Sequence, residues 1–281
     1  MGYGTILASI QSEEDIGDVM PVAMIVAKDH GAHVTALHVM TNPAALVHTP
    51  YEIDILVEAQ ERMREGARKR ADDLRKRFEV QVESEVDAVG EWRAVESLTP
   101  DIESILIDNA RCCDLTMIAQ PDPADNANRI GTLGEVILQT GRPVLVVPYT
   151  GTARSVGKRV FVAWNGSRES TRAVFDALPF LREADEVQLY IVEEDRQYYA
   201  AQIPGAALAA TLSRHGVRIT TEKAAKTDLT VAETLLSRLA DHGSDLLVMG
   251  GYGHSRAREY VFGGATRDIL RTMTVPVLFS H

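Results

Sequence analysis

Short apolar runs alternate with longer amphipathic segments along this chain. Apolar runs of about four to eight residues between polar or glycine-rich segments are typical of buried strands, whereas apolar residues spaced by three and four are typical of helices. The first half is therefore predicted to contain helices at 15–28 and 57–78, a further helix before each of its last two strands, and five strands. These strands are expected at residues 3–10, 33–40, 81–86, 114–119 and 144–147.

The second half repeats the same order of elements. Helices are predicted at 167–181, 198–214 and from a capping box at Thr230 and Glu233 to Gly243. Strands are predicted at residues 160–164, 187–192, 217–221, 246–249 and 275–279. A regular alternation of strands and helices favours parallel sheets with helices on both faces.

Three segment pairs indicate that the chain is a duplication. LASIQS matches VAWNGS, CDLTMIA matches SDLLVMG, and PVLVVP matches PVLFSH, in the same order in both halves. An internal repeat of this length defines the structural unit. Two domains are therefore predicted, at residues 1–150 and 157–281, joined by a linker of small residues.

The segment 245–281 carries the clearest chemical signal. An apolar run ends at Gly250, and Gly253 and Gly263 follow with the spacing G-x2-G-x9-G. Glycine leaves the backbone open to a ligand, and the exposed N–H groups of such a turn and of a following helix N-terminus can bind an anion. The spacing is neither that of a Walker A loop nor GxGxxG.

This segment resembles the nucleotide-binding signature of the universal stress protein family, G-x2-G-x9-G-(S/T). Gly264 stands at the position of the final Ser or Thr, and Thr266 is the nearest hydroxyl. The resemblance covers nearly the whole chain. It implies an α/β protein with two tandem doubly wound domains, each a five-stranded parallel sheet of order 3-2-1-4-5 covered by helices on both faces. It also implies that the two domains pair through their last strands around a pseudo-twofold axis.

The resemblance further implies that the C-terminal half binds ATP or another adenine nucleotide, with or without Mg²⁺. Phosphates would lie at the glycine loop, and adenine and ribose at the ends of the first two strands of that half. The expected nucleotide-binding residues are Ala163, Asn165, Val192, Met249, Gly250, Tyr252, Gly253, His254, Gly263, Gly264, Ala265 and Thr266.

Several of these positions differ from the family pattern. Asn165 replaces the usual acid, and an amide binds Mg²⁺ less well than a carboxylate. Tyr252 replaces a residue that is often His, and it could stack on the base or shield the loop. Arg256 and Arg258 could contact phosphate or form a solvated helix face, and both alternatives stay open.

The N-terminal half lacks the glycine signature described for the C-terminal half. Ala119-Gln120-Pro121-Asp122 occupies the place of the glycine loop, and prolines remove N–H donors. Asp122 and Asp125 would repel phosphate, and only Gly131-Thr132 remains of the distal part. This half is therefore interpreted as a partner domain that does not bind nucleotide.

Composition excludes several other functions. The 29 basic and 40 acidic residues give a net charge of −11, which disfavours nucleic acid and anionic membranes as partners. The sequence contains no apolar run of about 20 residues and no recognisable signal peptide, so a cytoplasmic protein is expected. Cys112 and Cys113 are interpreted as a small buried pair leading into a strand.

No catalytic residue and no structural metal are predicted. No Ser-His-Asp set or pair of carboxylates accompanies the glycine loop, so ATP hydrolysis would be slow at most. His30, His33 and His38 are interpreted as ordinary structural or surface histidines. The expected function is nucleotide-dependent regulation of an unidentified protein partner during stress. The alternatives are an interaction module that binds no nucleotide and, third, a slow ATPase, and a homodimer remains open.

Overall fold

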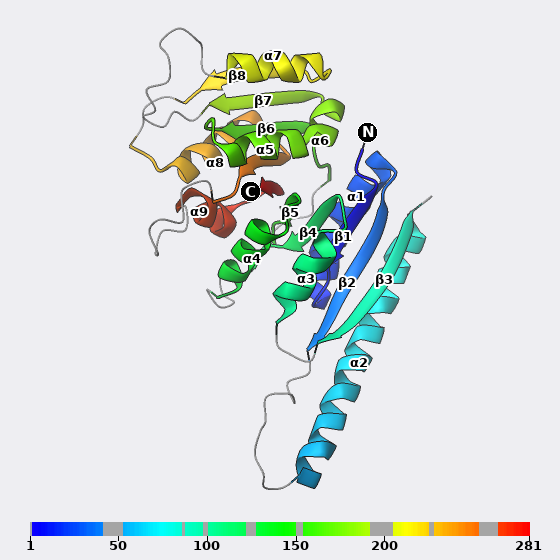
Figure 1. Cartoon of the computed structure of the whole chain (residues 1–281). Helices are drawn as coiled ribbons and strands as arrows, with labels where there is room; N and C mark the ends of the chain where they lie inside the picture. Colours follow the sequence, from blue (N-terminus) through cyan, green and yellow to red (C-terminus); the bar gives the residue numbers. More distant parts are fainter. Residues whose placement is uncertain are drawn as a thin grey trace.

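The structure is a computed structural model that describes residues 2–41, 53–85, 88–97, 101–121, 128–149, 154–191, 205–224, 228–252 and 264–281. Strands and helices alternate throughout, as the apolar pattern predicts (Figure 1). The first half contains β1 (Thr5–Ser9), α1 (Glu13–His30), β2 (His33–Thr41), α2 (Ile53–Ser84), β3 (Val89–Ser97), α3 (Ile102–Ala110), β4 (Leu115–Ala119), α4 (Asn128–Gln139) and β5 (Val144–Val147). The second half contains β6 (Arg159–Trp164), α5 (Arg168–Asp176), α6 (Leu178–Glu183), β7 (Glu186–Ile191), α7 (Ala206–Arg214), β8 (Ile219–Lys223), α8 (Val231–His242), β9 (Leu246–Gly250), α9 (Gly264–Thr272) and β10 (Val277–Ser280).

All ten strands form one sheet of order β3-β2-β1-β4-β5-β10-β9-β6-β7-β8. Within each half the strands are parallel and follow the order 3-2-1-4-5, which confirms the predicted fold class. The two halves therefore continue one another's sheet rather than stacking face to face (Figure 1).

The halves meet where β5 pairs with β10, the one antiparallel pair among these strands. Leu145 lies opposite Leu278, and these two residues occupy equivalent places in the repeat. On either side Val146 lies opposite Val277 and Val144 opposite Phe279, so exchanging the two halves reproduces the register. A local pseudo-twofold axis therefore passes between Leu145 and Leu278, as predicted for pairing through the last strands.

Helices cover both faces of the sheet, and each face has a core that extends across both halves. One core combines residues of α1, α2 and α5 with one side of the strands. The other combines residues of α3, α4, α8 and α9 with the opposite side. The long β2–α2–β3 connection places Leu74 and Phe78 inside the first core, as the helical spacing predicts.

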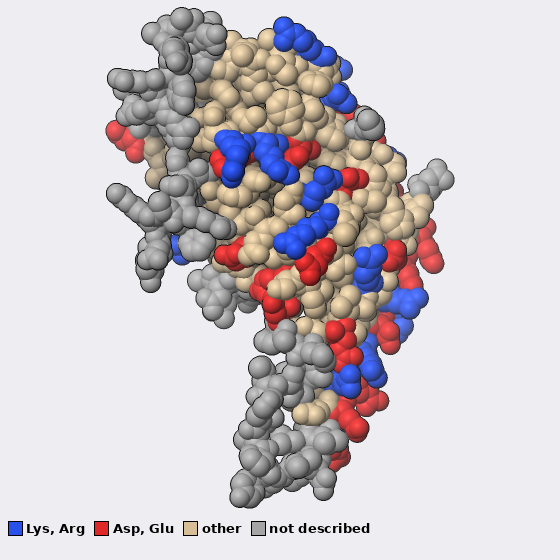
Figure 2. Space-filling model, in the orientation of Figure 1, with Lys and Arg blue, Asp and Glu red and all other residues tan. Residues whose placement is uncertain are grey.

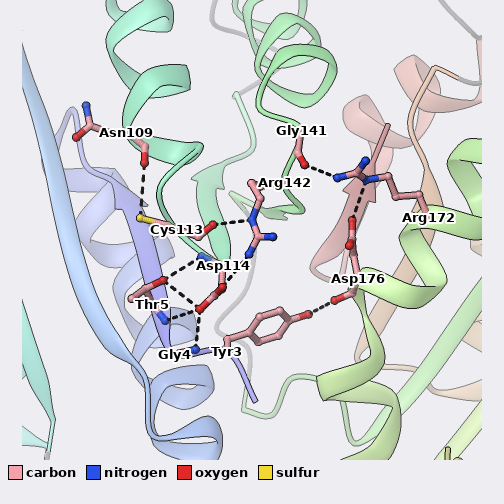
Figure 3. A network of polar contacts seen from close by, with 10 residues as sticks. All are labelled: Tyr3, Gly4, Thr5, Asn109, Cys113, Asp114, Gly141, Arg142, Arg172 and Asp176. Atoms are coloured by element: carbon pink, nitrogen blue, oxygen red, sulfur yellow. Dashed lines mark hydrogen bonds and ion pairs between the residues drawn. The ribbon is translucent and has the colours of Figure 1, made fainter. Parts of the chain in front are cut away.

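An aspartate at the start of the fourth strand of each half fixes the start of the first strand. Asp114 accepts hydrogen bonds from the N–H groups of Gly4 (2.9 Å) and Thr5 (3.1 Å), and Arg142 Nη2 lies 2.7 Å from its other oxygen (Figure 3). Burial opposes ionisation of Asp114, but these bonds and the guanidinium outweigh it and lower the pKa of the carboxyl. Asp245 accepts in the same way from Gly157 N (3.1 Å), among other donors.

The same network reaches across the joint between the halves. The Tyr3 hydroxyl donates to the carbonyl of Asp176 in α5 (2.8 Å), and Arg172 of α5 donates to the carbonyl of Gly141 (Figure 3). Gln120 Nε2 donates to the carbonyl of Leu270 in α9 (2.9 Å), and both groups are buried. These contacts cross the pseudo-twofold axis on both sides of β5 and β10.

Three predictions from the sequence were wrong in detail. Residues 81–84 belong to the end of α2, and the third strand is β3 (Val89–Ser97) instead of 81–86. The predicted helix 167–181 is divided into α5 and α6, because Pro179 cannot donate within a continuous helix. Cys112 is exposed and Cys113 half-buried, and both are free thiols, so they are not a buried pair.

The joint buries a histidine whose ring nitrogens make no hydrogen bond. His30 packs edge-on against Tyr3 and Phe180, with ring centroids 5.2 Å from each. Its Nδ1 lies 3.4 Å from a carboxylate oxygen of Glu183. Burial lowers the pKa of His30, while Glu183 and Asp29 oppose this shift and Lys158 adds to it.

We expect Leu145→Ala and Leu278→Ala each to lower the free energy of unfolding by about 2–5 kcal/mol, because both side chains are fully buried at the axis. The double variant should cost less than the sum of the two, because the residues face each other across one strand pair. Urea unfolding of the single and double variants measures this coupling. Additive costs would show that the pair does not act as the joint.

The free energy of unfolding should depend on pH through His30, which is buried where the two halves meet. The pKa of His30 is lower in the folded protein than its ordinary value of 6.5, so on acidification His30 binds a proton in the unfolded chain before it does so in the folded chain. The free energy of unfolding therefore falls as the pH drops below about 6.5. His30→Phe should flatten this slope by up to about 1.4 kcal/mol per pH unit. Unfolding at a series of pH values tests this, with His33→Phe as the matched control. An unchanged slope in His30→Phe would contradict it.

Candidate functional site

The C-terminal half has a topological switch between β6 and β9. These strands are neighbours, but α5 follows β6 on one face of the sheet and α9 follows the glycine loop after β9 on the other. Ligands of doubly wound sheets bind beyond the carboxyl ends of strands at such a point. Ala163 and Met249 are paired in register at these ends, so the structure brings two predicted site residues together.

The first turn of α5 forms one wall beside the end of β9. A Cβ atom at Gly250 would lie 2.5 Å from the backbone nitrogen of Ser170 and 2.7 Å from the carbonyl carbon of Glu169. Both contacts are with the backbone, so no side chain can be accommodated at Gly250. From the sequence, Gly250 is predicted only as a place where a ligand approaches the backbone, and its packing against α5 is a further role that the structure adds.

Tyr252 begins the glycine loop in a left-handed conformation, with φ of 54°. Its N–H donates to the hydroxyl oxygen of Thr266 (3.2 Å), so the buried Thr266 holds the start of the loop to α9. Burial, and secondarily Glu135, raise the pKa of Tyr252 to about 12. A Cβ at Gly134 of α4 would lie 2.5 Å from the Tyr252 hydroxyl, so this ring fills the space between the two halves.

Asn165 lies at the end of β6 and shapes the turn into α5. Its side-chain oxygen accepts the N–H of Ser167 (3.1 Å), and Ser167 in turn caps the helix by accepting the N–H of Ser170 (3.1 Å). The side chain is partly exposed beside the switch point. An amide here can bond a hydroxyl or a base, and it adds no negative charge.

The distal part of the predicted site begins α9. Gly264 is exposed, and a Cβ at this position would have no atom within 4 Å. Ala265 is partly exposed and Thr266 buried. The remaining predicted residues, Val192, Gly253, His254 and Gly263, lie outside the described residues, as do Arg256 and Arg258.

In the N-terminal half, protein side chains occupy the corresponding positions. Ile10, fully buried, replaces Asn165. Gln11 replaces Gly166, and its amide donates to the carbonyl of Leu37 (3.2 Å) while its oxygen accepts the N–H of Val39 (3.1 Å). The Gln11 side chain therefore ties the end of β1 to β2.

The loop after β4 is used for contact between the halves. Gln120 occupies the position of Gly251, and it reaches Leu270 of the other half. At the symmetric place, a Cβ on Gly251 would lie 2.8 Å from Ile137. Ile137 and Leu270 occupy equivalent positions in the repeat. The side chain of Gln120 therefore contacts Leu270 in the way that the backbone of Gly251 contacts Ile137.

The candidate histidines are separated. His30 lies at the joint, His33 Nε2 lies 3.9 Å from Glu91, and His38 Nδ1 bonds the carbonyl of Ile10 (2.8 Å). In the part of the chain that the structure describes, no cluster of three or more His, Cys, Asp or Glu side chains could hold a metal ion. None of the described helices is long and apolar enough to cross a membrane.

Comparison with known proteins identifies the C-terminal half by sequence. Residues 157–281 match the model of the universal stress protein family. A universal stress protein of Synechocystis is 44% identical over 46 residues, which is 16% of this chain and 16% of the relative's length.

Solved structures extend the similarity in fold to both halves. A universal stress protein from Archaeoglobus fulgidus superposes with a TM-score of 0.68 at 16% identity, covering 98% of this chain and 95% of that one. A functionally unknown protein from Pseudomonas aeruginosa superposes with a TM-score of 0.56 at 13% identity, covering 99% and 92%. The C-terminal half is therefore similar in sequence to the universal stress protein family, and both halves, in tandem, have the fold of the solved structures.

Proposed function

We propose that the C-terminal half binds one adenine nucleotide per chain and that this binding regulates an interaction of the protein during stress. The observation that carries the proposal is the pairing of a topological switch with a glycine loop. At the switch, Gly250 lies against the first turn of α5, and Gly264 leaves open space at the start of α9. A helix N-terminus with open backbone favours an anionic group such as a phosphate.

The proposed binding residues divide by the part of the nucleotide that they contact. Ala163, Asn165 and Val192 are assigned to adenine and ribose at the ends of β6 and β7, and Asn165 also stands at the position of the family's acid, which bears on Mg²⁺. The glycine loop, with His254, and the residues that open α9, Gly263 to Thr266, are assigned to phosphates. Gly250 and Thr266 also have structural roles, because one packs on α5 and the other holds Tyr252.

We further propose that the domain limits are 1–150 and 157–281 and that the first domain binds no nucleotide. The side chains of Ile10, Gln11 and Gln120 support this, since each is engaged in the core, in β2 or across the joint. The first domain then serves as a fixed partner of the second. We also propose that the protein is cytoplasmic, because adenine nucleotides and free thiols are both expected in that compartment.

An interaction module without nucleotide is the second candidate function. Gly264 and Asn165 favour it, because the family's hydroxyl and acid are both replaced. A slow ATPase is the third candidate, although no described residue beside the loop stands out as a general base for orienting a water molecule.

Thermal unfolding with ATP and with ADP, each with and without Mg²⁺, tests nucleotide binding. A ligand that binds only the folded chain stabilises it by RT ln(1 + [L]/Kd), or about 2.7 kcal/mol at a hundredfold excess over Kd. We expect stabilisation of the parent and its loss in Gly264→Val, because a branched side chain would occupy the open space at the start of α9. Gly250→Val would be a poor test, since it would clash with the backbone of α5.

The repeat supplies a matched control for this variant. Gly131 occupies the place of Gly264 in the first half, and a Cβ there likewise has no atom within 4 Å. Gly131→Val should therefore retain the full shift. No shift in the parent at millimolar nucleotide would favour the interaction module, and turnover above background would favour the ATPase. Loss of the shift in Gly131→Val alone would move the site to the first half.

The amide at Asn165 leads to a separate prediction about Mg²⁺. Asn165→Asp restores a carboxylate, which is a better ligand for a hard cation. We expect the variant to bind ATP more tightly in the presence of Mg²⁺ and no better, or less tightly, in its absence, because the added charge repels phosphate. Isothermal titration with and without Mg²⁺ measures the difference. An equal change under both conditions would show that this side chain does not lie near the metal or the phosphates.

A further inference from the structure

Strand β3 lies at one end of the ten-stranded sheet, so no strand among the described residues neighbours the backbone groups on its outer side. It is nine residues long and is paired with β2 along its whole length. A long, regular edge strand is a template for pairing with another chain, and proteins usually interrupt such edges.

The sequence of this edge is self-complementary when it is read in the opposite direction. Residues 89–95 read Val-Gly-Glu-Trp-Arg-Ala-Val, with Trp92 at the centre. If two copies pair antiparallel about Trp92, then Val89 lies opposite Val95, Glu91 opposite Arg93, and Trp92 opposite itself. Residues that lie opposite each other share a face of the sheet and contact one another directly.

The charged pair is available to a second chain. The side chains of Glu91 and Arg93 are 49% and 42% exposed, and Arg93 Nη2 lies 3.0 Å from Glu91 in the same chain. Arg93 also donates to the side-chain oxygen of Asn109 in α3 (3.0 Å), so its guanidinium is held in place before any pairing. In the pairing about Trp92, each carboxylate would lie beside its own arginine and opposite that of the other copy. The four charges then alternate in sign across the two strands. Figure 2 shows acidic and basic side chains interspersed along this edge of the molecule, where α2 and β3 lie.

Apolar groups flank the charges on the same strand. Val89 is 57% exposed, and the proposed register would cover it with Val95 of the second copy. On the other face Trp92 is partly buried between His38 and Phe78, with ring centroids 5.8 Å from each, so its position is fixed before pairing. The α2 helices pack on this face and would lie side by side in the pair.

We propose that β3 is a homodimer interface at which two copies of this chain pair antiparallel about Trp92. The occupant of the edge is a second copy because the charge pattern at Glu91 and Arg93 is complementary to itself. The pairing joins two ten-stranded sheets into one and is separate from the nucleotide site at β6 and β9.

Charge exchange tests the interface with the full chain. Arg93→Glu places glutamates opposite each other at two symmetric positions, so the dimer dissociation constant should rise about tenfold or more. Glu91→Arg should do the same. The double variant Glu91→Arg with Arg93→Glu restores opposite charges and should recover the dimer. Sedimentation velocity over a concentration series measures the constants, with circular dichroism to verify folding.

A charge change at the other edge is the control. Glu222→Arg lies on β8, and its side chain is exposed to a similar extent, 41%, so it should leave the dimer unchanged. Cysteine pairs then test the register on a Cys112→Ser, Cys113→Ser background. Val89→Cys combined with Val95→Cys should form a disulfide-linked dimer on mild oxidation, and neither cysteine alone should.

Three results would overturn the proposal. The parent could be a monomer at every concentration, the dimer could be insensitive to Arg93→Glu, or a single cysteine could cross-link as efficiently as the pair. A dimer that is weakened by both single charge changes and not recovered by the double variant would also exclude this register.

Discussion

The antiparallel pairing of β5 with β10 is the constraint on which the rest of this structure depends. It turns two five-stranded sheets into one and lets each layer of helices bury a core that crosses the joint. Each of the two apolar cores therefore contains buried residues of both halves. The contacts from Tyr3, Arg172 and Gln120 then fix the angle at which the halves meet.

The two halves of this duplicated chain differ in the side chains that follow their first and fourth strands. Where the second half has Asn165, Gly166 and Gly251, the first has an isoleucine and two glutamines. Gln11 and Gln120 form hydrogen bonds with backbone groups of β2, of the segment after β5 and of α9. Of the two, Gln120 bonds across the joint, so at that position the first half uses a side chain to hold the two halves together.

The strand order and the joint could be predicted because the repeat divides the chain into two units and the glycine signature carries a family resemblance that implies both. The boundaries at residues 81–86 could not, because the alternation of apolar and polar residues there also fits the last turns of a long amphipathic helix. The positions of Gly250 and Asn165 at the ends of β9 and β6 could be predicted, because the repeat fixes their places along the chain. The contacts of Tyr252 with Gly134 and of Gly250 with Ser170 were not, since they depend on how distant helices pack.

Joining β5 to β10 removes one edge from each half, and in the part of the chain that the structure describes β3 and β8 form the two ends of the sheet. These two edges are built differently. Strand β8 has five residues, and Thr220, Glu222 and Lys223 place polar groups along it, which is a common way to prevent pairing. Strand β3 is nearly twice as long and has opposite charges set symmetrically about a packed tryptophan. Like charges or a short strand would be enough to prevent aggregation at an edge. The symmetric placement of opposite charges in β3 instead favours pairing with a second copy of the same strand.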